Sequence, residues 1–346
     1  MTPSDHVPAY TLPSANRQVI LARRPDGIPA SGDFALAEAP VPAIGDGQFL
    51  VRNLYLSVDP AQRGWAADVA NYSAAVPLGA VMRALAAGVI VESRDPAFAA
   101  GSFVYGMFGW QDYAAANAAD VLTSFAAPRL PLSAYAGLLG INGLTAEISL
   151  AKYGGLAPGK TVIVSTAAGA VGSLVGQLAR LEGARTIGLT GSEAKRRKLL
   201  EHFGFDVGID YRAGDLAAAI DAVAPDGADL YFDNVGGEIL DLMLRRMKVA
   251  GRVIQCGTAS IDRWSPPPTG LRNEREVLTR RLSWQGFVIF DHREDFPRSL
   301  DRLQRAAAAG DLQHDEQVLA GIEQAPGAIE LLYAGRNEGK LLIWVG

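Results

Sequence analysis

The residues with the clearest chemical potential lie in the string STAAGAVGSLVGQLA, from Ser165 to Ala179. The string follows Thr161–Ser165 (TVIVS), a β-branched run that is typical of a buried parallel strand. A strand that passes through small residues into a helix brings unpaired N–H groups and the positive end of the helix dipole to one point. The pattern predicts a pyrophosphate site around Gly169 and Gly172, although close helix–sheet packing alone also uses such small residues.

The end of the next expected strand, Thr186–Thr190, bears on the choice of cofactor. A site for NAD usually places Asp or Glu there to bind the ribose 2′-hydroxyl, whereas a 2′-phosphate needs cations and hydrogen-bond donors. Here the strand continues into Gly191 and Ser192, and a basic run begins at Lys195. Glu193 stands where the first turn of a helix favours acids anyway. We therefore expect NADP(H) rather than NAD, with a solvated basic helix face as the alternative interpretation.

Two further glycine-bearing turns follow expected strands, DNVGG at Asp233–Gly237 and CGTAS at Cys256–Ser260. Ligands of open α/β sheets bind at the carboxyl ends of the strands. Because Asn234, Gly257 and Thr258 would all arrive at that edge, they are candidate parts of a cofactor site.

Other classes of chemistry find little support in the sequence. The four histidines are scattered (His6, His202, His292 and His314), and Cys256 is the one cysteine, so no ligand spacing of a zinc site is present. Neither a GxSxG motif nor a Walker A motif occurs. We interpret the histidines as surface residues and Cys256 as a buried structural thiol.

The elements that must position these residues alternate after Pro131 between strands and helices, which predicts a doubly wound parallel sheet. The expected strands are 161–165, 186–190, 207–210, 229–233, 252–256 and 283–289. One expected helix follows the glycine turn and ends near residue 182, and three more span 193–203, 216–223 and 238–247.

The first 125 residues contain short strands between Gly and Pro turns, such as Phe49–Leu56, Val89–Glu92 and a strand–turn–strand at Gly101–Gly109. The tail from His314 returns to β structure in Lys340–Val345. We therefore expect a mostly-β domain made of residues 1–130 and 312–346, and a Rossmann domain over residues 131–311.

Composition restricts the class of protein further. The chain has 346 residues, 49% of them apolar, with a net charge of −5, so a large core is available and nothing indicates binding to nucleic acid or an anionic membrane. The single cysteine fits a reducing compartment, and no apolar stretch is long enough to span a bilayer. We expect a soluble, cytoplasmic protein.

Many strings spread over nearly the whole chain carry a family resemblance. They are LSVDP at Leu56–Pro60, VYGMFGWQDY at Val104–Tyr113, GLTA at Gly143–Ala146, AAGAVGS at Ala167–Ser173, DNVGG at Asp233–Gly237, QGFV at Gln285–Val288, and Asn337 with Gly339 and Lys340. Together they resemble the zinc-independent medium-chain dehydrogenases/reductases, in the group of prostaglandin reductases, 2-alkenal reductases and bacterial curcumin reductases.

The resemblance implies a GroES-like catalytic domain beside the Rossmann sheet, a homodimer, and no metal. It implies hydride transfer from NADPH to the β-carbon of an α,β-unsaturated aldehyde or ketone, a small molecule being the expected partner. It assigns the pyrophosphate to Gly169, Ala170, Val171 and Gly172, the 2′-phosphate to Ser192, Lys195 and Tyr211, and the ribose and nicotinamide to Thr145, Asn234, Cys256, Gly257, Thr258, Phe287, Val288, Ile289 and Asn337.

The substrate half departs from the family pattern. Ala61 stands where relatives commonly have a tyrosine after the VDP motif. Where relatives have Thr-Ala-Tyr this chain has Thr145-Ala146-Glu147, and the segment 261–281, where relatives often place another pocket tyrosine, contains none. Tyr55, Tyr72 and Tyr113 lie near these motifs, and no catalytic acid is assigned. Two alternatives stay open, namely a quinone reductase of the same fold and a non-catalytic NADPH-binding sensor or scaffold.

Overall fold

The chain folds into two compact units, seen here in a computed structural model that describes residues 11–69 and 71–346. The first unit comprises residues 1–140 and 316–346, and the second comprises residues 141–315. The borders between the units fall after residues 140 and 315, whereas the sequence predicts them after residues 130 and 311. The interpretation of His6 as a surface residue lies outside the described residues.

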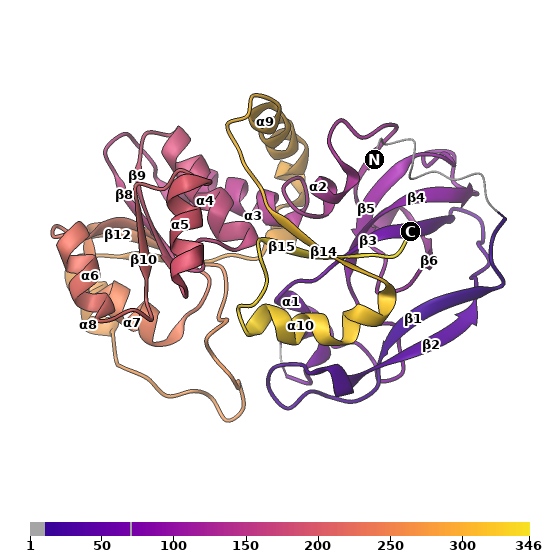
Figure 1. The fold of residues 1–346 in the computed structure, drawn as a ribbon, viewed down its shortest axis with the longest axis horizontal. Helices are drawn as coiled ribbons and strands as arrows, with labels where there is room; N and C mark the ends of the chain where they lie inside the picture. Colours follow the sequence, from indigo (N-terminus) through magenta and orange to yellow (C-terminus); the bar gives the residue numbers. More distant parts are fainter. Residues whose placement is uncertain (1–10, 70) are drawn as a thin grey trace. The chain divides into compact units, whose positions relative to one another are not determined.

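The second unit is built on a six-stranded parallel sheet with the strand order β10-β9-β8-β11-β12-β13 (Figure 1). Counted along the chain, this is the 3-2-1-4-5-6 order of a Rossmann fold, which confirms the predicted doubly wound sheet. Its elements are α3 (Ile141–Ser149), β8 (Thr161–Val164), α4 (Ala170–Leu181), β9 (Arg185–Thr190), α5 (Glu193–Glu201), β10 (Val207–Asp210), α6 (Leu216–Val223), β11 (Ala228–Asp233), α7 (Gly237–Leu244), β12 (Met247–Gln255), α8 (Glu274–Arg280), β13 (Ser283–Gly286) and α9 (Phe296–Ala308).

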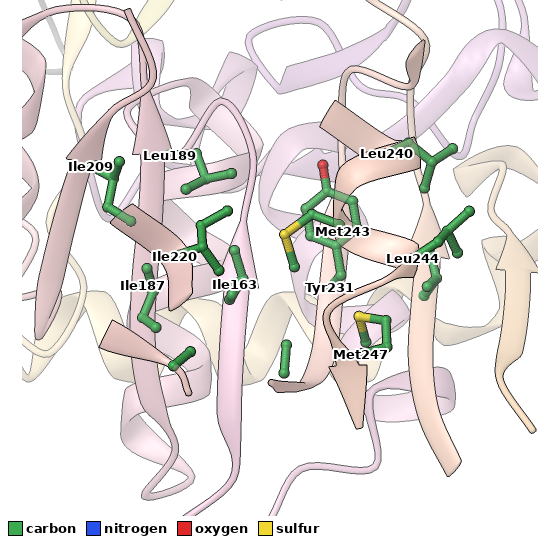
Figure 2. Close-up of a cluster of buried hydrophobic side chains, with 13 residues drawn as sticks. Ile163, Ile187, Leu189, Ile209, Ile220, Tyr231, Leu240, Met243, Leu244 and Met247 are labelled. Atoms are coloured by element: carbon green, nitrogen blue, oxygen red, sulfur yellow. The ribbon is translucent and has the colours of Figure 1, made fainter. Parts of the chain in front are cut away.

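Alternating residues of β9 separate the two faces of this sheet. Ile187 and Leu189 belong to a buried cluster with residues of α6 and α7, among them Ile220 and Met243 (Figure 2). Gly188 points to the other face, where a β-carbon would stand 2.6 Å from Leu199 of α5. Helices therefore cover both faces, and only the strand ends are left to meet a ligand.

Three expected elements were wrong in extent. The helix predicted to reach Met247 ends at Leu244, because Met247 is fully buried and pairs with Ala228 as the start of β12. The strand predicted to reach Ile289 ends at Gly286. The segment Gly101–Gly109 holds one strand rather than two, since it is paired on both sides with neighbouring strands.

The first unit contains a seven-stranded sheet in the order β14-β15-β3-β4-β5-β7, with β6 beside β3, and a separate β1–β2 pair. The return of the tail to β structure is confirmed, because β15 pairs antiparallel with β3. The elements are β1 (Ala15–Leu21), β2 (Phe34–Pro40), β3 (Phe49–Ser57), α1 (Ala61–Ala66), β4 (Leu85–Ser93), β5 (Phe103–Met107), β6 (Tyr113–Ala116), β7 (Val121–Phe125), α2 (Leu132–Ala136), β14 (Glu316–Ala320), α10 (Ala325–Tyr333) and β15 (Lys340–Trp344).

Candidate active site

Helix α4 begins at the glycine turn that the sequence assigns to a pyrophosphate. Its N-cap, Gly169, has no side chain to cap the first N–H groups, and no acid lies in the first turn. Helices α5 and α6 are capped instead by Ser192 and Asp215, whose side-chain oxygens accept N–H bonds at 3.3 and 3.2 Å. The first turn of α4 therefore presents its N–H groups and the positive end of its dipole without a capping side chain, which suits an external anion.

Gly172 is required by the close approach of helix and turn. A β-carbon at this position would stand 2.4 Å from the carbonyl oxygen of Thr166, a residue that itself adopts a φ of 51°. Ala170 and Val171 are half-buried and complete the turn. The structure thus brings the four residues predicted for the pyrophosphate into one turn, with Gly169 as the cap.

The three residues predicted for the 2′-phosphate gather at the carboxyl ends of β9 and β10. The N–H of Tyr211 donates to the carbonyl of Thr190 at 2.9 Å, which holds the two strand ends together. A β-carbon on Gly191 would stand 2.7 Å from the Tyr211 hydroxyl, so glycine makes room for the phenol. Ser192 accepts the backbone N–H of Lys195, and both side chains therefore start from the same helical turn.

The charges around this turn favour a phosphate over a ribose hydroxyl. Arg196 donates to the Glu193 carboxylate at 2.6 and 2.8 Å, and this hydrogen bonding holds the pKa of Glu193 below its usual value. The carboxylate is thereby engaged by a neighbouring cation. Arg212, to which the sequence analysis gave no role, lies with its guanidinium carbon 5.6 Å from the centre of the Tyr211 ring. The signal for such a position in the sequence is that Arg212 directly follows Tyr211.

Asp233, at the end of β11, organises the next loop from a fully buried position. Its carboxylate accepts the N–H groups of Val235 and Gly236 at 3.0 Å, the hydroxyl of Tyr231 at 2.9 Å, and the amide of Gln255 at 2.6 Å. Burial raises the pKa of Asp233, and these hydrogen bonds oppose the rise. In the sequence, Asp233 stands in the DNVGG turn, and an acid at the end of a buried strand is the signal that indicates such a role.

The loops after β11 and β12 are braced against each other. The N–H groups of Cys256 and Gly257 donate to the carbonyl of Asp233 at 2.8 and 3.1 Å, and a β-carbon on Gly257 would stand 2.6 Å from the Asn234 carbonyl. Thr258 follows in the same loop. Cys256 is half-buried rather than buried as predicted. Desolvation, with the nearby Asp233 charge, raises the pKa of its thiol to about 12, so the thiol keeps its proton at neutral pH.

The remaining predicted residues of the second unit are more dispersed along the chain. Thr145 is buried in α3, and its carbonyl accepts the Ser149 hydroxyl at 2.6 Å. Phe287 follows β13, and its ring stacks on His292 with the ring centres 4.9 Å apart. Val288 and Ile289 come next in the chain, and for these residues contact with a cofactor stays a prediction.

Asn337 belongs to the first unit, where its buried amide donates to the Gly339 carbonyl at 2.8 Å. Three residues further on, Lys340 forms a buried ion pair with Asp59 at 2.6 Å and donates to the Val58 carbonyl at 2.9 Å. This network fixes the VDP segment to the start of β15 and so positions Ala61, the first residue of α1.

The second departure from the family pattern, Glu147, has a structural account. Its carboxylate is 4% exposed and accepts a hydrogen bond from Arg302 of α9 at 3.2 Å. Arg302 also donates to Glu182 at 2.5 Å, at the end of α4. Glu147 therefore takes part in an ion-pair network that links α3, α4 and α9.

The three tyrosines named from the sequence occupy different surroundings in the first unit. Tyr113 is buried in a small apolar cluster with Ile44 and Leu50. The Tyr55 ring packs against Trp344 with the ring centres 5.0 Å apart. Tyr72 is 53% exposed and lines an open cavity of about 410 Å³ formed by residues 68, 69 and 71–75.

Within residues 11–69 and 71–346, no three His, Cys, Asp or Glu side chains are grouped so that they could hold a metal ion. In the same part of the chain, every helix is too short or too polar to cross a membrane.

The donor set fits a dinucleotide with a 2′-phosphate. The first turn of α4 carries no capping side chain, and Ser192, Lys195 and Tyr211 follow the ends of β9 and β10. Ser192, Lys195 and Tyr211 would hold the 2′-phosphate there.

Comparison with known proteins decides the family. The profile described as "N-terminal domain of oxidoreductase" matches residues 17–123, and that described as "Zinc-binding dehydrogenase" matches residues 170–305. The chain is 38% identical over 339 residues to a putative NADP-dependent oxidoreductase of Bacillus subtilis, covering 96% of this chain and 99% of that protein. The chain belongs to the medium-chain dehydrogenase/reductase family.

Further relatives place this medium-chain dehydrogenase/reductase in the predicted group. A 2-alkenal reductase (NADP(+)-dependent) of Nicotiana tabacum is 36% identical, covering 96% of this chain and 98% of that protein. The crystal structure of CurA in complex with NADPH from Vibrio vulnificus superposes with a TM-score of 0.89 at 33% identity, covering 95% and 99% of the two chains. These findings confirm the predicted family and fold.

Proposed function

We propose that this protein uses NADPH to reduce the carbon–carbon double bond of α,β-unsaturated aldehydes and ketones. The observation that supports this most is the relationship to a 2-alkenal reductase over nearly the full length of both chains. The donor set at the ends of β9 and β10 supports the choice of NADPH over NADH.

The residues of the second unit would hold the cofactor. The first turn of α4, from Gly169 to Gly172, would bind the pyrophosphate, and the braced loops that carry Asn234, Gly257 and Thr258 would line the ribose and nicotinamide. When bound, NADPH supplies a hydride for the β-carbon of the substrate, and solvent supplies the proton for the α-carbon.

The chain must also stabilise negative charge on the substrate carbonyl oxygen as an enolate develops. A hydrogen-bond donor aimed at that oxygen in a dry site typically accounts for about 10²–10³ in rate. Ala61, the first residue of α1, has no phenol where relatives commonly have one, and the smaller side chain would leave more room for a substrate. We infer that the enzyme accepts bulky aryl enones better than short alkenals.

The assembly and location are part of the same proposal. A homodimer in a reducing compartment such as the cytoplasm, with a small-molecule substrate and no nucleic-acid or membrane partner, fits the group and the single cysteine of the sequence. The mostly-β unit would bind the substrate, and the Rossmann unit would bind the cofactor.

One assay tests the proposed function. NADPH consumption is followed with a short alkenal, a chalcone-like enone and a quinone, and each product is identified. The proposal predicts saturated aldehydes and ketones as products. Turnover of the quinone alone would make the protein a quinone reductase, and NADPH binding without turnover of any acceptor would make it a sensor or scaffold; either result contradicts the proposal.

A further inference from the structure

The phenol of Tyr333 contacts the residue that immediately precedes Ala61, the position at which relatives commonly have a tyrosine. Tyr333 is the last residue of α10, and α10 lies beside α1 in the first unit (Figure 1). Its hydroxyl donates to the carbonyl of Pro60 at 3.3 Å. Because Pro60 immediately precedes Ala61, a residue from a distant part of the sequence brings a phenol to the start of α1.

This hydroxyl is available to a ligand at small cost. The Pro60 carbonyl also accepts the backbone N–H of Arg63 at 3.1 Å, so it keeps a partner when the phenol turns away. The bond from Tyr333 is long for an O–H donor, whose usual distance to oxygen is about 2.7–2.8 Å.

Arg63 holds the ring in place. Its guanidinium carbon lies 5.5 Å from the centre of the Tyr333 ring, and Arg63 is one of the buried residues of α1. A cation over the face of a ring stabilises that ring position. Burial raises the pKa of Tyr333, and Arg63 opposes the rise. The phenol therefore keeps its proton at neutral pH, as a donor must.

The tyrosines named from the sequence lack this combination of position and support. Tyr113 is buried in an apolar cluster, and Tyr55 packs on Trp344. Tyr72 is exposed on a loop, where its backbone N–H donates to the side-chain oxygen of Asn71 at 2.8 Å. Tyr72 is therefore a suitable comparison residue rather than the first choice.

We propose that the Tyr333 hydroxyl replaces the phenol that Ala61 lacks and donates a hydrogen bond to the carbonyl oxygen of the substrate. This inference rests on the proposed function, because the bond stabilises the enolate that forms when the double bond is reduced. Tyr333 is then a catalytic residue whose position is set by Arg63.

The substitution Tyr333→Phe tests the role of the hydroxyl, because it keeps the ring on Arg63 and removes only the oxygen. We expect kcat for a small enone to fall by about 10²-fold, while the Kd for NADPH and the melting temperature stay near those of the wild type. The matched control, Tyr72→Phe, should change kcat by less than about twofold.

A second variant provides a rescue. In the double variant Ala61→Tyr with Tyr333→Phe, the donor returns from the position used by relatives, and kcat for the small enone should recover at least about tenfold over Tyr333→Phe alone. A merely structural role of Tyr333 would not allow this recovery.

The outcomes separate the two proposals. If the wild type reduces enones and Tyr333→Phe does so at the same rate, or if only Tyr72→Phe loses activity, the assignment of Tyr333 is wrong while the proposed function stands. If the wild type reduces no enone at all, the proposed function fails, and the role of Tyr333 fails with it.

Discussion

The Tyr211 hydroxyl lies so close to Gly191 that a β-carbon on residue 191 would stand 2.7 Å from it. The contact holds a phenol at the end of β9, beside the helical turn that carries Ser192 and Lys195. The absence of a side chain at Gly191, after β9, therefore leaves the space that the Tyr211 side chain, after β10, occupies.

We expect the choice of cofactor to depend on Lys195. Charge-assisted hydrogen bonds typically contribute about 1.5–3 kcal/mol each. We expect Lys195→Ala to weaken NADPH binding by about tenfold or more and to leave NADH binding almost unchanged. Kd values for both cofactors, measured by fluorescence titration, check this expectation.

Arg197→Ala is the matched control, because Arg197 lies on the same helix with its guanidinium 3.8 Å from Glu193. It should affect both cofactors little. Equal losses for NADPH and NADH in Lys195→Ala would show that this lysine does not bind the phosphate.

The small side chain at Ala61 predicts the size of the preferred substrate. We expect Ala61→Tyr to lower kcat/KM for bulky aryl enones by about tenfold, since the ring occupies volume that a large substrate needs, and to spare or improve short alkenals. Kinetic constants for a matched pair of large and small enones measure the effect. An unchanged ratio between the two substrates would mean that residue 61 does not face the substrate.

Metal removal should leave the enzyme active. The described residues provide no cluster of three metal-ligating side chains, so exhaustive chelation should change kcat by less than about twofold. Elemental analysis before and after chelation provides the control. Stoichiometric zinc whose removal abolishes turnover would contradict the expectation.

The raised pKa of Cys256 predicts slow modification of the native thiol. A thiol with a pKa of about 12 holds its proton in the folded protein at pH values where an unfolded chain, with the usual pKa near 9, releases it. Alkylation should therefore be much slower in the native protein than in urea at about pH 9.

The same difference lowers the stability of the fold as pH rises from about 9 towards 12, because the unfolded chain then loses a proton that the native chain keeps. Alkylation followed by mass spectrometry over this range measures the thiol directly. Equal rates in the native and unfolded chains would show that Cys256 is exposed and ionised.

Local patterns were sufficient to predict the Rossmann sheet. The β-branched run before Ala167 and the acid-free strand end before Ser192 are signals contained in consecutive residues. Four of the six strands form close to their expected bounds, whereas β12 begins earlier and β13 ends earlier than expected. The helix that was expected to reach Met247 failed for a tertiary reason, because burial and pairing with Ala228 outweigh helical periodicity.

The substrate side was harder to predict because its contacts join distant segments. Tyr333 and Pro60 are far apart in the sequence, and the partner of Glu147 lies on α9. No local spacing links such residues, whereas Asp233 stands inside the DNVGG motif and Arg212 directly follows Tyr211.

The central claim is that a hydride reaches the β-carbon of an enone. The most direct measurement uses NADPH labelled with deuterium at the transferable position, a chalcone-like enone, and mass and NMR analysis of the product. The account predicts a saturated ketone with deuterium on the β-carbon. An allylic alcohol with deuterium on the former carbonyl carbon would contradict it.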